Sequence, residues 1–84
     1  MGRTEIMERI ANMLKQDFNV KIDVDENTAL IKDNILDSLD FMNYITMIES
    51  SYKISISNED ILESKLGIIG NMVIYIEKAT GTGK

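Results

Sequence analysis

The stretch DSLDFMNYITMIESSY, residues 37–52, carries the clearest structural signal of the 84-residue chain. Asp37 is a residue type that caps helix N-termini, and Asp40 stands where the acid of a capping box belongs. Apolar residues follow at helical spacing, namely Phe41, Ile45, Ile48 and Tyr52. The pattern therefore predicts a helix that begins at the Asp-Ser pair and ends near Tyr52 or Lys53.

Three other segments have the signals of helices. Thr4 can cap a helix over about residues 4–17, and Ser57 or Asn58 can cap a short one. The apolar face of the first helix would comprise Ile6, Ile10, Met13 and Leu14. A last helix over about residues 69–79 would bury Ile69, Met72, Val73 and Ile76.

Residues 18–36 keep no single period. Val20, Ile22 and Val24 alternate with charged residues, which would suit a strand, but an isolated strand has no partner in a helical chain. We therefore expect a long ordered loop in this region. Four apolar side chains are predicted to pin it to the core, namely Ile22, Leu30, Ile31 and Leu36.

These elements predict an all-α fold, a four-helix bundle with a long first loop and a short third helix. We expect one small domain over residues 1–80 and a flexible tail over residues 81–84. A domain this small has little room for a deep enzyme cleft, and we expect no catalytic activity of its own.

The composition excludes several kinds of chemistry. The chain has no Cys and no His, so it has no thiol nucleophile, no thiolate zinc site and no histidine general base. A net charge of −5 disfavours nucleic acid and favours basic protein surfaces as partners. No apolar run approaches the about 20 residues that span a bilayer, and none forms a secretory signal. We expect a cytoplasmic monomer without membrane insertion.

One acidic segment partly matches a calcium-binding loop. Asp23, Asp25 and Asn27 occupy the first three ligand positions of an EF-hand. Thr28 replaces the glycine of the sharp turn, and Asn34 replaces the bidentate glutamate. We therefore expect a solvated acidic loop and no metal site.

Ser38 is a candidate attachment site. A serine in the first turn of a helix, after a long loop, exposes its hydroxyl beside unpaired N–H groups that favour a phosphate. The same residues also suit a plain helix start. Leu39 lies nearly opposite the apolar face, in line with Asn43, Thr46 and Ser50, and is a candidate docking residue.

The segment DNILDSLD, residues 33–40, resembles the phosphopantetheine attachment site of acyl carrier proteins. Residues 52–57 resemble the family's aromatic-x-x-x-Ile-Pro segment, with Ser57 in the place of proline, and residues 73–76 resemble the end of its last helix. The likeness extends over nearly the whole chain. Where the family commonly has a glycine before the motif, Asn34 can adopt the same left-handed backbone.

The resemblance implies that Ser38 carries 4′-phosphopantetheine through a phosphodiester, installed from coenzyme A by a phosphopantetheinyl transferase. Asp37 would help the transferase and its metal engage Ser38. The terminal thiol would hold acyl groups as thioesters, and it would supply the thiol that a chain without Cys lacks.

The resemblance also predicts a partner surface for enzymes that load and process acyl groups through basic patches. Its residues would be Leu39, Asp40, Met42, Asn43, Thr46 and Glu49. The family's corresponding helix is often strongly acidic on its outer face, whereas only Asp40 and Glu49 are acids here. This difference indicates a dedicated lipid, fatty-acid or polyketide-type pathway.

Two other functions stay open at this point. An aminoacyl or peptidyl carrier would use the same attachment serine. A cofactor-free helical interaction domain would use Leu39 and Met42 as its apolar anchors.

Overall fold

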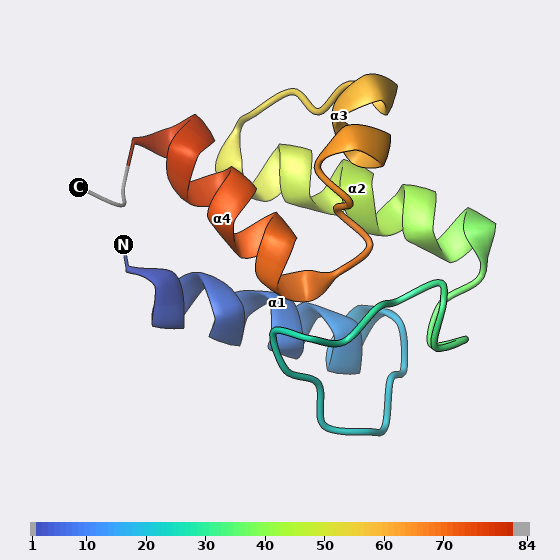
Figure 1. Ribbon diagram of the computed structural model, residues 1–84. Coiled ribbons are helices and arrows are strands. Elements are labelled where there is room, and N and C mark those ends of the chain that lie inside the picture. Colours follow the sequence, from blue (N-terminus) through green and yellow to red (C-terminus); the bar gives the residue numbers. More distant parts are fainter. Residues whose placement is uncertain (1, 82–84) are drawn as a thin grey trace.

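The computed structural model describes residues 2–81, and this range forms four helices and no strand (Figure 1). The helices are α1 (Arg3–Asp17), α2 (Ser38–Tyr52), α3 (Asn58–Glu63) and α4 (Ile69–Thr80). The predicted all-α fold, with its long first loop and short third helix, is confirmed. Of the expected tail, Gly81 ends α4 in the left-handed conformation, and residues 82–84 lie outside the described range.

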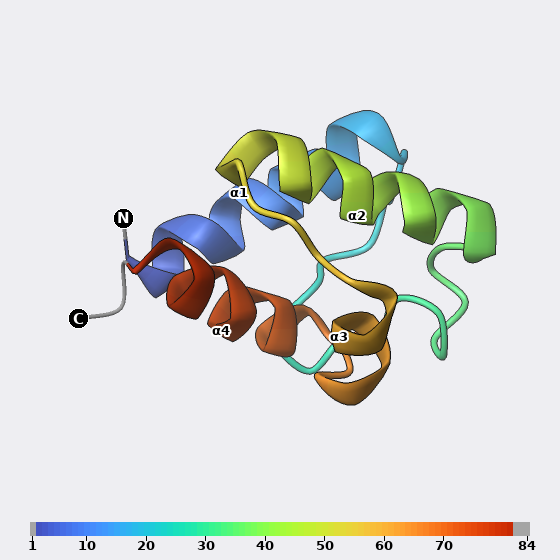
Figure 2. The same cartoon turned by 90° about the horizontal axis from the view of Figure 1, so that it is seen from above.

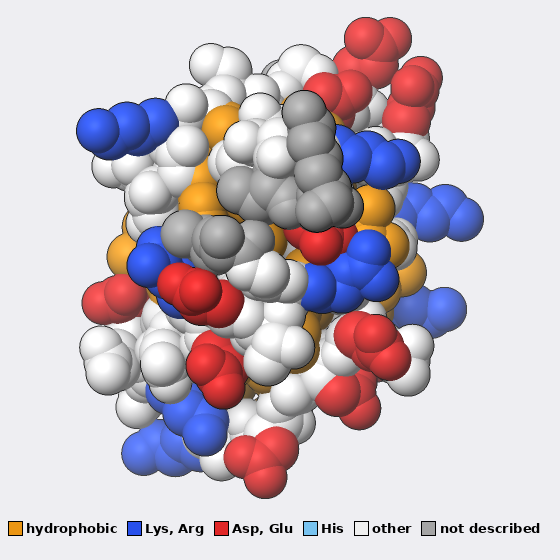
Figure 3. Space-filling view, turned by 90° about the vertical axis from the view of Figure 1, so that its left-hand side faces the viewer, with side chains coloured by type: hydrophobic (Ala, Val, Ile, Leu, Met, Phe, Trp, Pro, Cys, Tyr) orange, Lys and Arg blue, Asp and Glu red, His pale blue; other side chains and the backbone are white. Residues whose placement is uncertain are grey.

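The helices are arranged so that the start of α2 lies far from the start of α1. Helices α1 and α4 pack directly against each other, and α2 runs back roughly antiparallel to α1 (Figures 1 and 2). The beginning of α1 and the end of α4 therefore share one end of the molecule. Figure 3 looks at that end, where acidic and basic side chains are interspersed. The beginning of α2 occupies the opposite end, and the long loop runs across the molecule to the beginning of α4 (Figure 1).

The core is built from the apolar faces that the spacing predicts. Helix α4 buries its four predicted residues, and α1 buries three of its four, with Met13 packed against them. Helix α2 also buries Tyr44, which was missing from its predicted face. The buried hydrophobic residues are Ile6, Ile10, Leu14, Val20, Leu30, Leu36, Phe41, Tyr44, Ile45, Ile48, Ile56, Leu66, Ile69, Met72, Val73 and Ile76.

The long loop is attached to the core by different residues from those expected. Leu30 and Leu36 are buried as predicted, but Ile22 is 55% exposed and Ile31 is 41% exposed, so the prediction for these two was wrong. The chain turns back after α1, where the Val20 N–H donates to the Leu14 carbonyl, and this turn directs Val20 into the core. Burial in the loop thus follows its turns and not a regular alternation.

Backbone hydrogen bonds join the loop to the beginning of α4. Ala29 and Ile68 form an isolated antiparallel bridge, and the Leu30 N–H donates to the Gly67 carbonyl at 2.8 Å. In the first turn of α4, the N–H groups of Ile69 and Gly70 donate to loop carbonyls at 3.0 and 2.9 Å. The loop therefore supplies the acceptors that this helix N-terminus needs.

Helix α1 begins one residue before the predicted cap. It starts at Arg3, with Gly2 in the N-cap position and no side-chain cap, so the prediction that Thr4 caps it was wrong. The Arg3 guanidinium binds the buried Glu77 carboxylate of α4, with its Nε donating at 2.9 Å. This ion pair holds the first turn of α1 against α4.

Helix α3 is short and buries none of its residues. Ser57 caps it as predicted, because its hydroxyl accepts from the Asp60 N–H at 3.1 Å. The Tyr75 hydroxyl of α4 donates to the Asp60 carboxylate at 2.7 Å, and this bond raises the pKa of Tyr75. Polar contacts thus hold α3 on the bundle, together with the half-buried Ile61.

Candidate functional site

Ser38 is the first residue of α2, and its side chain is exposed. Asp37 precedes it with extended backbone, and the Asp37 Oδ1 accepts from the Asp40 N–H at 2.8 Å. The predicted N-cap is therefore confirmed. No hydrogen bond joins the Ser38 hydroxyl to another group within residues 2–81. The hydroxyl is therefore accessible from solution.

A tight turn before α2 fixes the direction in which Ser38 is presented. The N–H groups of Ile35 and Leu36 both donate to the Leu30 carbonyl, at 2.9 and 3.0 Å. Asn34 has a φ of 59°, the left-handed conformation that its residue type was expected to allow. Because Leu30 and Leu36 are buried, the turn is anchored on the core immediately before the site.

The first turn of α2 leaves N–H groups open to solvent beside the Ser38 hydroxyl. The Asp40 N–H is taken by the cap, and the Phe41 N–H donates to the Asp37 carbonyl. Within the described part of the chain, the N–H groups of Ser38 and Leu39 have no acceptor. Such N–H groups and the positive end of the helix dipole favour a bound anionic group.

Four of the six residues predicted for the outer surface of α2 are exposed. Leu39 is 72% exposed and Met42 is 46% exposed, and Asn43 and Thr46 are exposed beside them. The Thr46 hydroxyl donates to the Met42 carbonyl. This uncharged, partly apolar surface lies directly after Ser38 along the helix.

The two acids predicted for this surface are both half-buried. The Glu49 carboxylate accepts from the Ile56 N–H at 2.8 Å, in the segment that follows α2. Glu49 therefore holds the α2–α3 connection in place, and its part in binding partners stays a prediction. Asp40 lies in the first turn, where its charge favours the helix N-terminus.

Two known proteins match the chain over nearly its whole length. No family model matches the chain. Over 81 residues, it is 30% identical to the acyl carrier protein of Thermotoga maritima, a match that covers 95% of this chain and 98% of that protein. Over 82 residues, it is 28% identical to the acyl carrier protein of Lactobacillus acidophilus, covering 96% and 100%.

The chain belongs to the acyl carrier protein family. Acyl carrier proteins are non-catalytic carriers, and this chain is therefore a carrier and not an enzyme.

Two aromatic rings seat the beginning of α2 of this carrier on its core. The rings of Phe41 and Tyr44 stack with their centroids 5.8 Å apart. Burial raises the pKa of the Tyr44 hydroxyl, and the nearby Tyr52, when ionised, raises it further. The buried Tyr44 hydroxyl has no hydrogen-bond partner among residues 2–81. Tyr44 follows Phe41 by three residues and precedes Ile48 by four, so helical spacing was the signal that could have placed it in the core.

The acidic segment of the carrier's loop is organised by its own backbone. The Asp25 Oδ1 accepts from the Asn27 N–H at 2.9 Å and from the Thr28 hydroxyl at 3.2 Å. In the part of the chain that the structure describes, no three acidic side chains gather where they could hold a metal ion. The absence of calcium binding stays a prediction. Within the same range, no helix is both long and apolar enough to cross a membrane.

Proposed function

We propose that Ser38 is the attachment residue for 4′-phosphopantetheine and that the chain carries acyl groups on this arm. The observation that supports the proposal is the exposed, unbonded Ser38 hydroxyl at the first position of α2. The relatives named acyl carrier protein support the same class of cargo, in preference to an aminoacyl or peptidyl group.

The residues around Ser38 fit a phosphodiester. The open N–H groups of Ser38 and Leu39 would donate to its oxygens, and the helix dipole would favour its charge. Asp37 has its carboxylate in the cap, which holds the first turn in place while a phosphopantetheinyl transferase engages the serine. When bound, the group would supply a thiol on which acyl groups are carried as thioesters, chemistry that a chain without Cys lacks.

We further propose that the carrier serves a dedicated lipid, fatty-acid or polyketide-type pathway. Asn43 and Thr46 leave the exposed side of α2 without charge, and the Glu49 carboxylate is occupied by the Ile56 N–H. Charge steers encounter and partner choice more than it sets affinity. Loading and processing enzymes that bind this surface would therefore depend more on Leu39 and Met42 than on acidic residues.

The attachment proposal is tested by the intact mass of the chain. After incubation with coenzyme A and a broad-specificity phosphopantetheinyl transferase, the mass should rise by one phosphopantetheine. Ser38→Ala should abolish the increase, whereas Ser50→Ala, an exposed serine on the same helix, should leave it unchanged. A wild-type mass that stays constant with several transferases would contradict the proposal and favour a cofactor-free interaction domain.

The dedicated-pathway proposal is tested by adding acids to the outer side of α2. Asn43→Asp with Ser50→Glu should improve loading by general fatty-acid synthesis enzymes, and the improvement should fade as salt rises because exposed charges are screened. The uncharged pair Asn43→Gln with Ser50→Gln is the matched control. If the unaltered holo-protein already serves those enzymes as well as a general carrier does, the proposal is wrong.

A further inference from the structure

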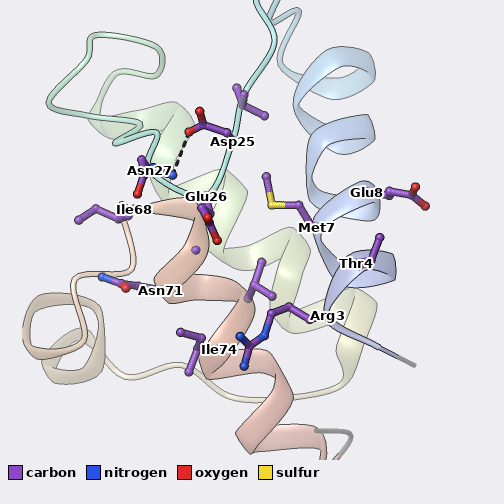
Figure 4. A pocket seen from close by; sticks show the side chains of 13 residues that line it. Arg3, Thr4, Met7, Glu8, Asp25, Glu26, Asn27, Ile68, Asn71 and Ile74 are labelled. Carbon is purple, nitrogen blue, oxygen red and sulfur yellow. Dashed lines mark hydrogen bonds between the residues drawn. The ribbon is translucent and has the colours of Figure 1, made fainter.

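A groove lies between α1 and α4, on a part of the molecule that the carrier site does not use. It has a volume of about 740 Å³ and is lined by the first turns of α1 and α4 and by residues 24–27 of the long loop (Figure 4). Helix α2 contributes none of its lining residues. A group that occupied the groove would therefore leave Ser38 and the exposed side of α2 accessible.

The floor and walls of the groove are apolar. Met7 points from α1 into the space beside α4 (Figure 4). Ile74 of α4, which is 38% exposed, Val24 of the loop and Ile68 before α4 also line the groove. Met7, Val24 and Ile68 are half-buried. Covering apolar side chains that line a concave surface favours binding, because it removes their surface from water.

The charges around the groove are predominantly acidic. Glu26 overhangs the first turn of α4 and Asp25 lies next to it, whereas the Glu8 side chain on α1 points away from the groove (Figure 4). All three are exposed, and the carboxylates of Glu8 and Glu26 have no ion-pair partner among residues 2–81. The basic lining residue is Arg3, and its guanidinium already pairs with Glu77 at 2.8 Å.

We propose that this groove is a second docking surface, and that it binds a protein segment carrying lysine or arginine next to an apolar side chain. A lysine or arginine has an aliphatic stem that can lie on Met7 and Ile74 while its charged head reaches the Glu26 carboxylate. An apolar neighbour would occupy the space between α1 and α4. The groove thus has apolar walls and an acidic rim, and such a segment complements both.

The location of the acids supports this choice of occupant. Asn43 and Thr46 on the exposed side of α2 are uncharged, whereas the exposed acids Asp25 and Glu26 stand at the groove. A basic segment would therefore be steered toward the α1–α4 side. This inference goes beyond the proposed attachment at Ser38 and does not depend on it.

The test is an NMR titration of the isotope-labelled full chain with a short synthetic peptide of alternating leucine and lysine. We expect shift changes centred on the amides of Met7, Asn27, Asn71 and Ile74, and an affinity that falls with added salt. A peptide with glutamate in place of lysine should bind more weakly. Butylamine, which has the cation of a lysine side chain but no peptide chain and no apolar neighbour, should also bind more weakly.

Single substitutions identify the residues responsible. Glu26→Gln should weaken peptide binding by about two- to fivefold, as expected for one exposed ion pair. Glu63→Gln, an exposed acid on α3, is the matched control and should leave the affinity unchanged. Ile74→Ser should weaken binding by removing an apolar wall, and Ser38→Ala should have no effect.

Several outcomes would overturn the inference. These are shifts confined to α2, equal binding of the glutamate peptide, equal binding of butylamine, and insensitivity to Glu26→Gln. A Ser38→Ala chain that binds the peptide normally but gains no mass with coenzyme A would support this surface and the attachment proposal separately.

Discussion

The first N–H groups of α2 and α4 find their hydrogen-bond acceptors in different ways. Each helix starts with N–H groups that have no acceptor inside the helix. At α2 the Asp37 side chain, adjacent in sequence, takes one of them, and the Ser38 and Leu39 N–H groups face solvent. At α4 there is no side-chain cap, and the carbonyls of Glu26 and Thr28 accept from Gly70 and Ile69.

The difference separates a structural helix end from one that is available for chemistry. The end of α4 is closed by a distant part of the chain and is buried at Ile69. The end of α2 is held by one local residue, with Ser38 and Leu39 exposed. Substitutions at the two ends should therefore have unequal effects on stability.

The largest difference is expected between Ile69→Ala and Leu39→Ala. Ile69 is fully buried, so truncation removes core contacts and should cost about 2–5 kcal/mol of unfolding free energy. Leu39 is exposed, and its truncation should change stability by no more than about 0.5 kcal/mol. Urea unfolding followed by circular dichroism measures both. Equal losses would mean that the two helix ends are attached to the core alike.

A smaller loss is expected for Gly70→Ala. A Cβ at this position would lie 2.7 Å from the Glu26 carbonyl oxygen, so either the loop or the helix must shift. We expect a cost of about 1–3 kcal/mol, as for other overpacked sites.

Gly67→Ala is the matched control for that substitution, because a Cβ there meets no atom within 4 Å. Its unfolding free energy should change by less than about 1 kcal/mol. An increase is compatible with this expectation, because alanine lowers the entropy of the unfolded chain. If both alanine variants unfold at the same urea concentration, the close approach between the loop and α4 is not maintained in solution.

A loss somewhat smaller than that of Gly70→Ala is expected at the α2 cap. Asp37→Ala removes the acceptor for the Asp40 N–H and should cost about 0.5–2 kcal/mol. Asp37→Asn keeps an acceptor oxygen and should retain most of that stability. Hydrogen exchange of the Asp40 amide should be faster in Asp37→Ala and unchanged in Asp37→Asn. Unchanged exchange there would mean that the side-chain cap contributes little to α2.

Sequence reasoning was most successful where the deciding contacts are local. The Asp37 and Ser57 caps depend on residues three positions apart, and both were predicted. Failures occurred where a distant segment decides the outcome. Ile22 and Ile31 are exposed because turns in the loop direct other residues inward, and the first turn of α1 is held by Glu77, which lies 74 positions from Arg3.

The sequence by itself determined the number and order of the helices, the apolar faces of α1 and α4, and the serine at the first turn of α2, because capping and helical periodicity act over a few residues. Only the tertiary structure decided that Glu49 would hold the Ile56 N–H, that Gly70 would lie under the Glu26 carbonyl, and that α1 and α4 would leave an acid-rimmed groove between them. Each of these features joins residues whose proximity depends on how the whole chain packs, and spacing along the sequence carries no such information.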